Sequence, residues 1–168
     1  MNDSTPRLAA WHQRYGAVDL PVAGGPPAHY GDPEGEGVAA CTAAALVDLS
    51  DRDLWEVTGR DRIRLLHAML SNDVKNRPPG EGCLATFCNE QGRMVSDLRL
   101  LVLEDRVWID LEPGVGAVLV PEIERFIVAD KAYLAPLGAT VAALGLVGPG
   151  AAAALAGVGV AGAGPVPR

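Results

Sequence analysis

Residues 83–102 read CLATFCNEQGRMVSDLRLLV and contain two strand-like runs on either side of a turn. The first run, CLATFC, is typical of a buried strand, and NEQG between the runs has the composition of a tight turn. A third run, RVWIDL at 106–111, follows a further turn at Glu104 and Asp105. These runs predict a β-meander, in which consecutive strands pair antiparallel.

The run at 93–103 carries a carboxylate where an apolar side chain would be ordinary. Successive side chains of a strand point to opposite faces. One face is largely apolar and holds Met94, Ser96, Leu98, Leu100 and Val102. The other is polar near the turn and apolar further on, with Arg93, Val95, Asp97, Arg99, Leu101 and Leu103. From the pattern alone, an exposed row of ion pairs among Asp97 and the two arginines is favoured. The alternative is the mouth of a ligand cleft with Leu101 and Leu103 as its floor.

The remaining chain alternates between helical and strand patterns. Helices are expected over 6–17, 37–46 and 114–128, with a further helix beginning at 151–156. Ile63, Leu66, Met69 and Leu70 recur at helical spacing and predict another helix, with Asn72 as a candidate left-handed cap. Strands are expected over 54–57, 131–134 and 140–147, and the Pro/Gly-dense segment 18–37 is expected to be a loop. Gly59 is expected to turn the chain. This order predicts the α+β class, with a mainly antiparallel sheet and packed helices.

Composition narrows the function classes. The 168 residues suffice for one domain with a sizeable core, and the net charge of −7 argues against a general nucleic-acid or anionic-membrane surface. The three cysteines, Cys41, Cys83 and Cys88, form no even disulfide framework, so a reducing, cytoplasmic compartment is expected. They are interpreted as small buried thiols, and no metal site is predicted. The uncharged stretch 137–167 is Gly-interrupted, which favours strand, turn and short helix over a membrane span.

Several stretches together resemble the folate-binding YgfZ family, which is related to the T-protein (aminomethyltransferase) of the glycine cleavage system. They are WHQRYGA, HYGDP, ALVDLSDRDLWEVTGRDRIRLLHAMLSNDV, PGEGCLATFCNEQGRMVSDLRLLV, WIDL and ERFIVADKAYL. The LSNDV segment, the N-E-x-G-R turn and the LSDR segment at 49–52 favour the YgfZ branch. T-proteins usually have a second acid where this chain has Ser96, and a His-Met pair where it has Asp51 and Arg52.

The resemblance implies a tetrahydrofolate pocket in a GcvT/YgfZ-type folate-binding domain. Asp97 matches the catalytic aspartate of the T-protein, while Glu112 and Leu84 fall near its pocket asparagine and tyrosine. A reduced pterin presents N–H donors to a carboxylate, its benzoyl ring needs an apolar wall, and its glutamate tail needs Arg or Lys. The residues expected to bind the cofactor are Asp97, Arg93, Arg99, Arg52, Asn72, Leu101 and Glu112.

The resemblance also implies three alternative functions. The first is a folate-dependent helper of iron–sulfur protein assembly and repair, with iron–sulfur client proteins as partners and effects on dependent tRNA modification. The second is aminomethyl transfer to tetrahydrofolate, and the third is a truncated, non-catalytic remnant or interaction module. Enzyme status stays open, and no direct nucleic-acid or membrane partner is expected.

The family's organisation gives three expected segments. They are an N-terminal helix and loop (1–37), a folate-binding α+β core (38–136) and an incomplete start of the next strand–helix unit (137–168). YgfZ proteins carry a K-G-C-x-G-x-E motif in their second half, and this chain does not contain it. We therefore expect the chain to be an apparently truncated N-terminal portion of such a protein.

Overall fold

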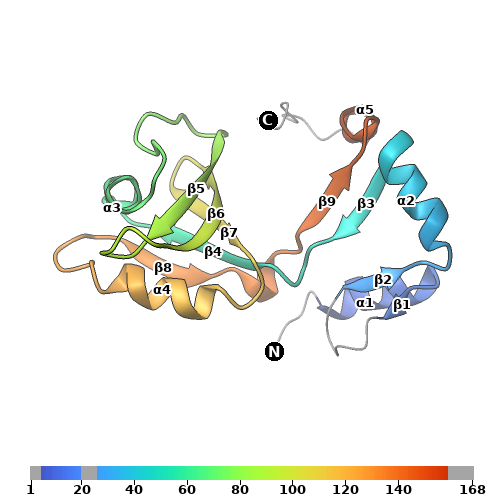
Figure 1. Cartoon of the computed structure of the whole chain (residues 1–168), viewed down its shortest axis with the longest axis horizontal. Helices are drawn as coiled ribbons and strands as arrows, with labels where there is room; N and C mark the ends of the chain where they lie inside the picture. The colour runs from blue at the N-terminus through green and yellow to red at the C-terminus, as the bar shows by residue number, and fades with distance from the viewer. Residues whose placement is uncertain (1–4, 20–25, 159–168) are drawn as a thin grey trace. The chain divides into compact units, whose positions relative to one another are not determined.

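The computed structural model describes residues 5–19 and 26–158, which divide into two compact units (Figure 1). Unit 1 comprises residues 1–51 and 139–168, and unit 2 comprises residues 52–138. Both units combine helices with antiparallel strands, so the predicted α+β class is confirmed. The three segments expected from the family stay a prediction, because they were defined by function, whereas the two units are defined by compact packing.

Unit 2 is built on a five-stranded antiparallel sheet with the strand order β5-β6-β7-β4-β8. Its strands are β4 (Asp53–Thr58), β5 (Gly82–Cys88), β6 (Met94–Val102), β7 (Arg106–Leu111) and β8 (Tyr133–Pro136). Its helices are α3 (Arg62–Met69) and α4 (Gly116–Glu124). The consecutive pairing of β5, β6 and β7 confirms the meander predicted from residues 83–111.

The core of unit 2 follows the alternation of β6. Leu98, Leu100 and Val102 are buried, and they belong to one apolar cluster with Leu66 of α3 and Leu119 of α4. Residues on the other face of β6 are exposed or half-buried. Burial of apolar surface against the helices therefore fixes which face of the strand is free to meet a ligand.

Gly59 lies where the chain leaves β4 and approaches the segment before β8. Its φ is +95°, and a Cβ atom at this position would lie 2.1 Å from the backbone oxygen of Lys131. No other residue type fits both conditions. The predicted turn at Gly59 is thus confirmed.

Unit 1 contains two small antiparallel pairs, β1 with β2 and β3 with β9. Its strands are β1 (Val18–Asp19), β2 (Pro27–His29), β3 (Ala45–Asp48) and β9 (Leu144–Val147). Its helices are α1 (Thr5–Arg14), α2 (Pro33–Thr42) and α5 (Ala151–Gly157), and the 3-10 turn η1 (Gly138–Thr140) lies at the unit boundary. Among the described residues, no helix is both long and apolar enough to cross a bilayer.

Two local predictions near α2 are wrong. The segment 18–37 is not a loop throughout, since β1, β2 and the start of α2 lie in it, although residues 20–25 fall outside the description. The helix expected over 37–46 begins at Pro33 and ends at Thr42. Asp32 caps it by accepting a hydrogen bond from the Gly35 amide, and proline at the first helical position suits this start.

Two further predictions fail for individual side chains. Asn72 is not a left-handed cap, because no described residue other than glycine has a positive φ. Instead α3 ends at Met69, and Leu70 is extended, buried and bridged to Phe87 of the edge strand. The cysteines are not all buried, since Cys41 and Cys88 are exposed and Cys83 is half-buried.

Candidate functional site

The strand register assembles polar side chains on the open face of the unit 2 sheet. Arg99 of β6 lies directly across from Asp110 of β7, and on its other side from Leu84 of β5. Asp97 lies across from Thr86, two residues along β6 and therefore on the same face as Arg99. Residues far apart in the sequence thus share one surface.

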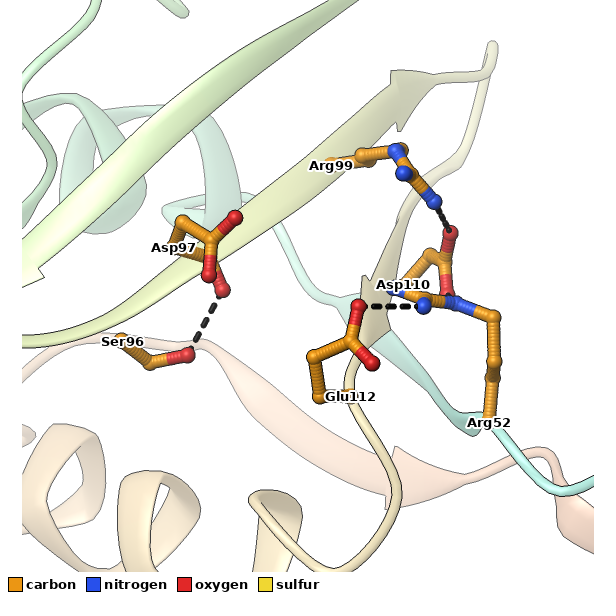
Figure 2. Close-up of polar contacts among 6 residues, drawn as sticks. All are labelled: Arg52, Ser96, Asp97, Arg99, Asp110 and Glu112. Carbon is orange, nitrogen blue, oxygen red and sulfur yellow. Dashed lines mark hydrogen bonds and ion pairs between the residues drawn. The ribbon is translucent and has the colours of Figure 1, made fainter.

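Arg52 is the centre of an ion cluster on this face (Figure 2). Its Nε donates to Asp110 Oδ1 at 2.5 Å and its Nη1 donates to Glu112 Oε1 at 2.6 Å. The second oxygen of Asp110 accepts from Arg99 Nη1 at 3.2 Å. The cluster therefore contains two guanidinium groups and two carboxylates, and each of these charges is paired within it.

Burial and hydrogen bonding act against each other at Arg52, whose side chain is only 11% exposed. Desolvation alone would lower the pKa of Arg52, but the hydrogen bonds and charges of Glu112 and Asp110 outweigh it and raise that pKa. The hydrogen bond from Arg52 lowers the pKa of Glu112. Both groups stay charged at neutral pH.

Asp97 does not join this cluster. Its carboxylate is exposed and forms no hydrogen bond or ion pair with any residue in the described part of the chain. Its neighbour Ser96 is buried and satisfies its hydroxyl by donating to the Asp97 backbone carbonyl at 2.6 Å (Figure 2). The expected ion-pair row of Asp97 with two arginines is thus wrong, because Arg99 pairs with Asp110.

Three other residues expected to bind a cofactor also lie outside the ion cluster. Asn72 Nδ2 donates to the Leu84 backbone oxygen at 2.8 Å and so closes the edge of the sheet. Arg93 is exposed in the turn before β6, and within the described residues its side chain has no partner. Leu101 is half-buried and lies across from Trp108. Sequence reasoning missed Asp110 and Trp108, although alternation in RVWIDL places them on one face.

A second polar cluster lies within unit 1 and was also missed. The Tyr30 hydroxyl and His12 Nδ1 are 2.6 Å apart, and His12 Nε2 lies 2.8 Å from Asp48 Oδ2. The three side chains border a largely apolar cavity of about 280 Å³, which is also lined by Leu8, Trp11, Leu46 and Leu144. Burial, then the charges of Asp48 and Glu36, raise the pKa of Tyr30. A phenolate nucleophile is therefore disfavoured, and the cluster acts as a clasp between α1 and β3.

Comparison with known proteins assigns this architecture to a protein family. The family model described as GCVT N-terminal domain matches residues 8–161. This chain belongs to the GCVT N-terminal domain family. The match covers both units, so the GCVT-type fold is shown for nearly the whole chain. It supports the wider family rather than the YgfZ branch in particular.

Two curated relatives show what this GCVT-family chain is similar to. Mitochondrial aminomethyltransferase of Gallus gallus is 32% identical over 110 residues, which cover 64% of this chain and 28% of the relative. Aminomethyltransferase of Streptomyces coelicolor is 34% identical over 99 residues, 58% of this chain and 27% of the relative. The chain thus matches under a third of the length of these curated relatives.

A solved structure has the same fold. The crystal structure of glycine cleavage system aminomethyltransferase T from Bartonella henselae superposes with a TM-score of 0.79 at 27% identity. The superposition covers 91% of this chain and 43% of that chain. The GCVT-family chain is therefore similar to part of a larger protein.

Proposed function

We propose that the open face of the unit 2 sheet forms one wall of a tetrahydrofolate site, and that the chain serves folate-dependent aminomethyl transfer. The observation that carries this proposal is Asp97, an exposed carboxylate without a partner among the described residues. The aminomethyltransferase relatives support the reaction class. The match covers under a third of the length of these relatives. Assigning their complete reaction to this chain is therefore also a proposal.

The side chains around Asp97 suit part of a reduced folate. A carboxylate accepts the N–H donors of a reduced pterin, and Asp97 is free to do so. Leu84, which is 59% exposed, and the half-buried Leu101 offer apolar surface for an aromatic ring. Arg52 does not suit the glutamate tail, because its guanidinium is already held by two carboxylates. Arg93 is the better candidate.

Asp97 has a defined role under this proposal. It would hold the pterin N–H groups and guide the movement of a proton while the one-carbon unit is transferred. Its neighbour Ser96 points into the core and cannot help, since it is buried and bonded to backbone. Asp97 is therefore the acid on which the proposed site depends.

A YgfZ-like role in iron–sulfur protein maturation is the second candidate. The observation that favours it is Leu84, which lies on the same face. The resemblance to the family implies a tyrosine at about this position in T-proteins. The wall consequently lacks a phenol there, and Ser96 removes the second acid. Under this alternative the site binds tetrahydrofolate while iron–sulfur client proteins are the partners.

Titration with tetrahydrofolate tests the site. Trp108 lies across from Leu101 on the proposed wall, so its fluorescence should change as the ligand saturates the chain. Asp97→Asn should remove most of the binding, whereas Glu90→Gln changes an exposed acid in the neighbouring turn and should bind normally. Absence of a saturable change in the unaltered chain would refute the site and leave the non-catalytic module as the explanation.

The reaction class needs a separate assay. Aminomethyl transfer predicts that an aminomethylated lipoyl carrier and tetrahydrofolate give methylenetetrahydrofolate, ammonia and the dithiol form of the carrier. Formation of these products should depend on Asp97. Folate binding without any product, combined with retrieval of iron–sulfur proteins by the same chain, would instead support the YgfZ-like role.

A further inference from the structure

On the open face of the unit 2 sheet, Arg106 pairs with Glu56, and five other charged side chains bear on the proposed site. Arg52 and Arg99 contribute two positive charges, and Asp97, Asp110 and Glu112 contribute three negative charges. Four of the five are joined in one cluster, and Asp97 is left out of it. The question is why Asp97, and neither Asp110 nor Glu112, is the carboxylate without a partner.

Arg99 could in principle pair with either of two carboxylates. Asp97 is two residues away on the same strand face, about 7 Å along the strand. Asp110 is directly across on β7, where opposite side chains are separated by about 5 Å. The structure shows Arg99 Nη1 on Asp110 Oδ2 at 3.2 Å and not on Asp97.

Asp110 is held in place for this pairing. Arg52, which is largely buried, fixes Oδ1 of Asp110 and leaves Oδ2 turned toward Arg99. Arg52 also holds Glu112, the residue that follows β7. On the 99↔110 register, Glu112 is the position that would face Asp97 if the ladder continued by one step. Its charge is therefore balanced by Arg52, and Arg99, two residues from Asp97 on the same strand face, is a cation with which Asp97 could otherwise pair.

We propose that Asp110 is a positioning residue that captures Arg99 and thereby keeps the Asp97 carboxylate unpaired for a ligand. The importance of this for tetrahydrofolate rests on the function proposed above, but the capture itself needs no ligand. Without the Asp110 carboxylate, Arg99 would turn to Asp97 and mask it. The resulting ion pair would have to be broken each time a pterin N–H bound.

A double-mutant cycle measures the capture directly. Asp97→Asn, Arg99→Gln and the double variant are compared by urea unfolding of the full chain, first in the native background and then with Asp110→Ala. The coupling between positions 97 and 99 should be absent in the native background. With Asp110→Ala it should change the unfolding constant by roughly two- to fivefold, the range for an exposed ion pair.

The result can overturn the proposal in three ways. Coupling between Asp97 and Arg99 in the native background would show that Asp110 does not capture Arg99; this arm needs only exposed substitutions and remains decisive if Asp110→Ala fails to fold. Absence of coupling in a folded Asp110→Ala background would show that Arg99 cannot reach Asp97. Coupling that persists in Asp110→Glu would show that the carboxylate is not what matters.

Binding provides the second readout. Tetrahydrofolate should bind Asp110→Ala roughly two- to fivefold more weakly than the native chain, because the new pair must be broken. Asp110→Glu should restore the affinity, and so should Asp110→Ala combined with Arg99→Gln. Unchanged affinity in Asp110→Ala would contradict masking. If the native chain does not bind tetrahydrofolate, the proposed function fails while the unfolding cycle still decides the capture.

Discussion

The two units are stabilised in different ways. Every buried apolar side chain in the described part of the chain belongs to unit 2, where the sheet and two helices share one cluster. In unit 1, apolar side chains such as Trp11, Leu46 and Leu144 remain substantially exposed. Unit 1 instead has the Tyr30–His12–Asp48 clasp, in which polar groups are satisfied by one another.

The polar clusters of the two units also differ in whether every charged side chain has a partner. In unit 1, His12 and Asp48 are 13% and 7% exposed and bond directly to each other. On the unit 2 sheet, the arginines pair with Asp110 and Glu112 and leave an exposed carboxylate unused. A closed cluster stabilises a fold, whereas a cluster that excludes one of its acids leaves that acid available for chemistry.

The largest effect should come from truncating the core of unit 2. Leu66→Ala removes a fully buried side chain and should cost about 2–5 kcal/mol of unfolding free energy through lost burial and a cavity. Leu46→Ala, on the half-exposed β3 of unit 1, should cost well under half as much. Urea unfolding of both variants measures the contrast, and equal losses would show that the units do not differ in this way.

Breaking the clasp should have the next largest effect. His12→Ala leaves Asp48 Oδ2 and the Tyr30 hydroxyl without their shared hydrogen-bond partner. This should lower the free energy of unfolding by about 1–3 kcal/mol. Thermal unfolding and limited proteolysis of the α1 segment report it. Gln13→Ala changes the exposed neighbour and serves as the control. A similar response of the two variants would mean that the clasp contributes nothing.

Tyr30→Phe removes one hydrogen bond of the clasp and should cost about 0.5–1.5 kcal/mol. Since burial raises the pKa of Tyr30 in the folded chain, its stabilising contribution is complete below the pKa of an unfolded tyrosine and is lost as pH rises through the folded pKa. Ultraviolet titration should show a late-ionising phase that Tyr30→Phe abolishes and Tyr15→Phe retains. Persistence of that phase in Tyr30→Phe would contradict the assignment.

The smallest effect is expected from Arg52→Met, and it should depend on pH. Arg52 lowers the pKa of Glu112, so the stabilisation from this pair is present above the ordinary glutamate pKa and disappears as pH falls through the lowered value. The variant should therefore be less stable than the native chain at pH 7. The difference should shrink as pH falls below the ordinary glutamate pKa and vanish once Glu112 is protonated in the folded chain. Urea midpoints at several pH values test this, with Arg93→Met as the control. A difference independent of pH would exclude the pair as its source.

Much of unit 2 could be predicted from local pattern. Alternation along β6 identified the buried face correctly, and the turn residues around NEQG and Gly59 marked where strands end. Prediction failed where the signal was not periodic. The helix start at Asp32 and Pro33 lies within a Pro/Gly-rich stretch that hides it. Asn72 resembles a helix cap by residue type, but the bridge between Leu70 and Phe87 ends the helix earlier, and no local pattern indicates that bridge.

The sequence predicts some residues of the candidate site but not all of them. Asp97, Arg99, Arg52 and Glu112 were selected, and their roles as folate ligands stay predictions. Asp110 was missed because its importance comes from the register of β7 against β6 and from Arg52, which lies 58 positions earlier in the chain. No local pattern contains that information.

The sequence by itself determined the α+β class, the meander and the face on which Asp97 lies, because each depends on periodicity and on residues with restricted backbone geometry. Only the tertiary structure decided which carboxylate Arg99 binds. Asp97 and Asp110 are equally capable partners by charge, and cross-strand distance together with the largely buried Arg52 selects Asp110. Asp97 is therefore unpaired because of how the strands are aligned, which is a property of the fold and not of any single segment.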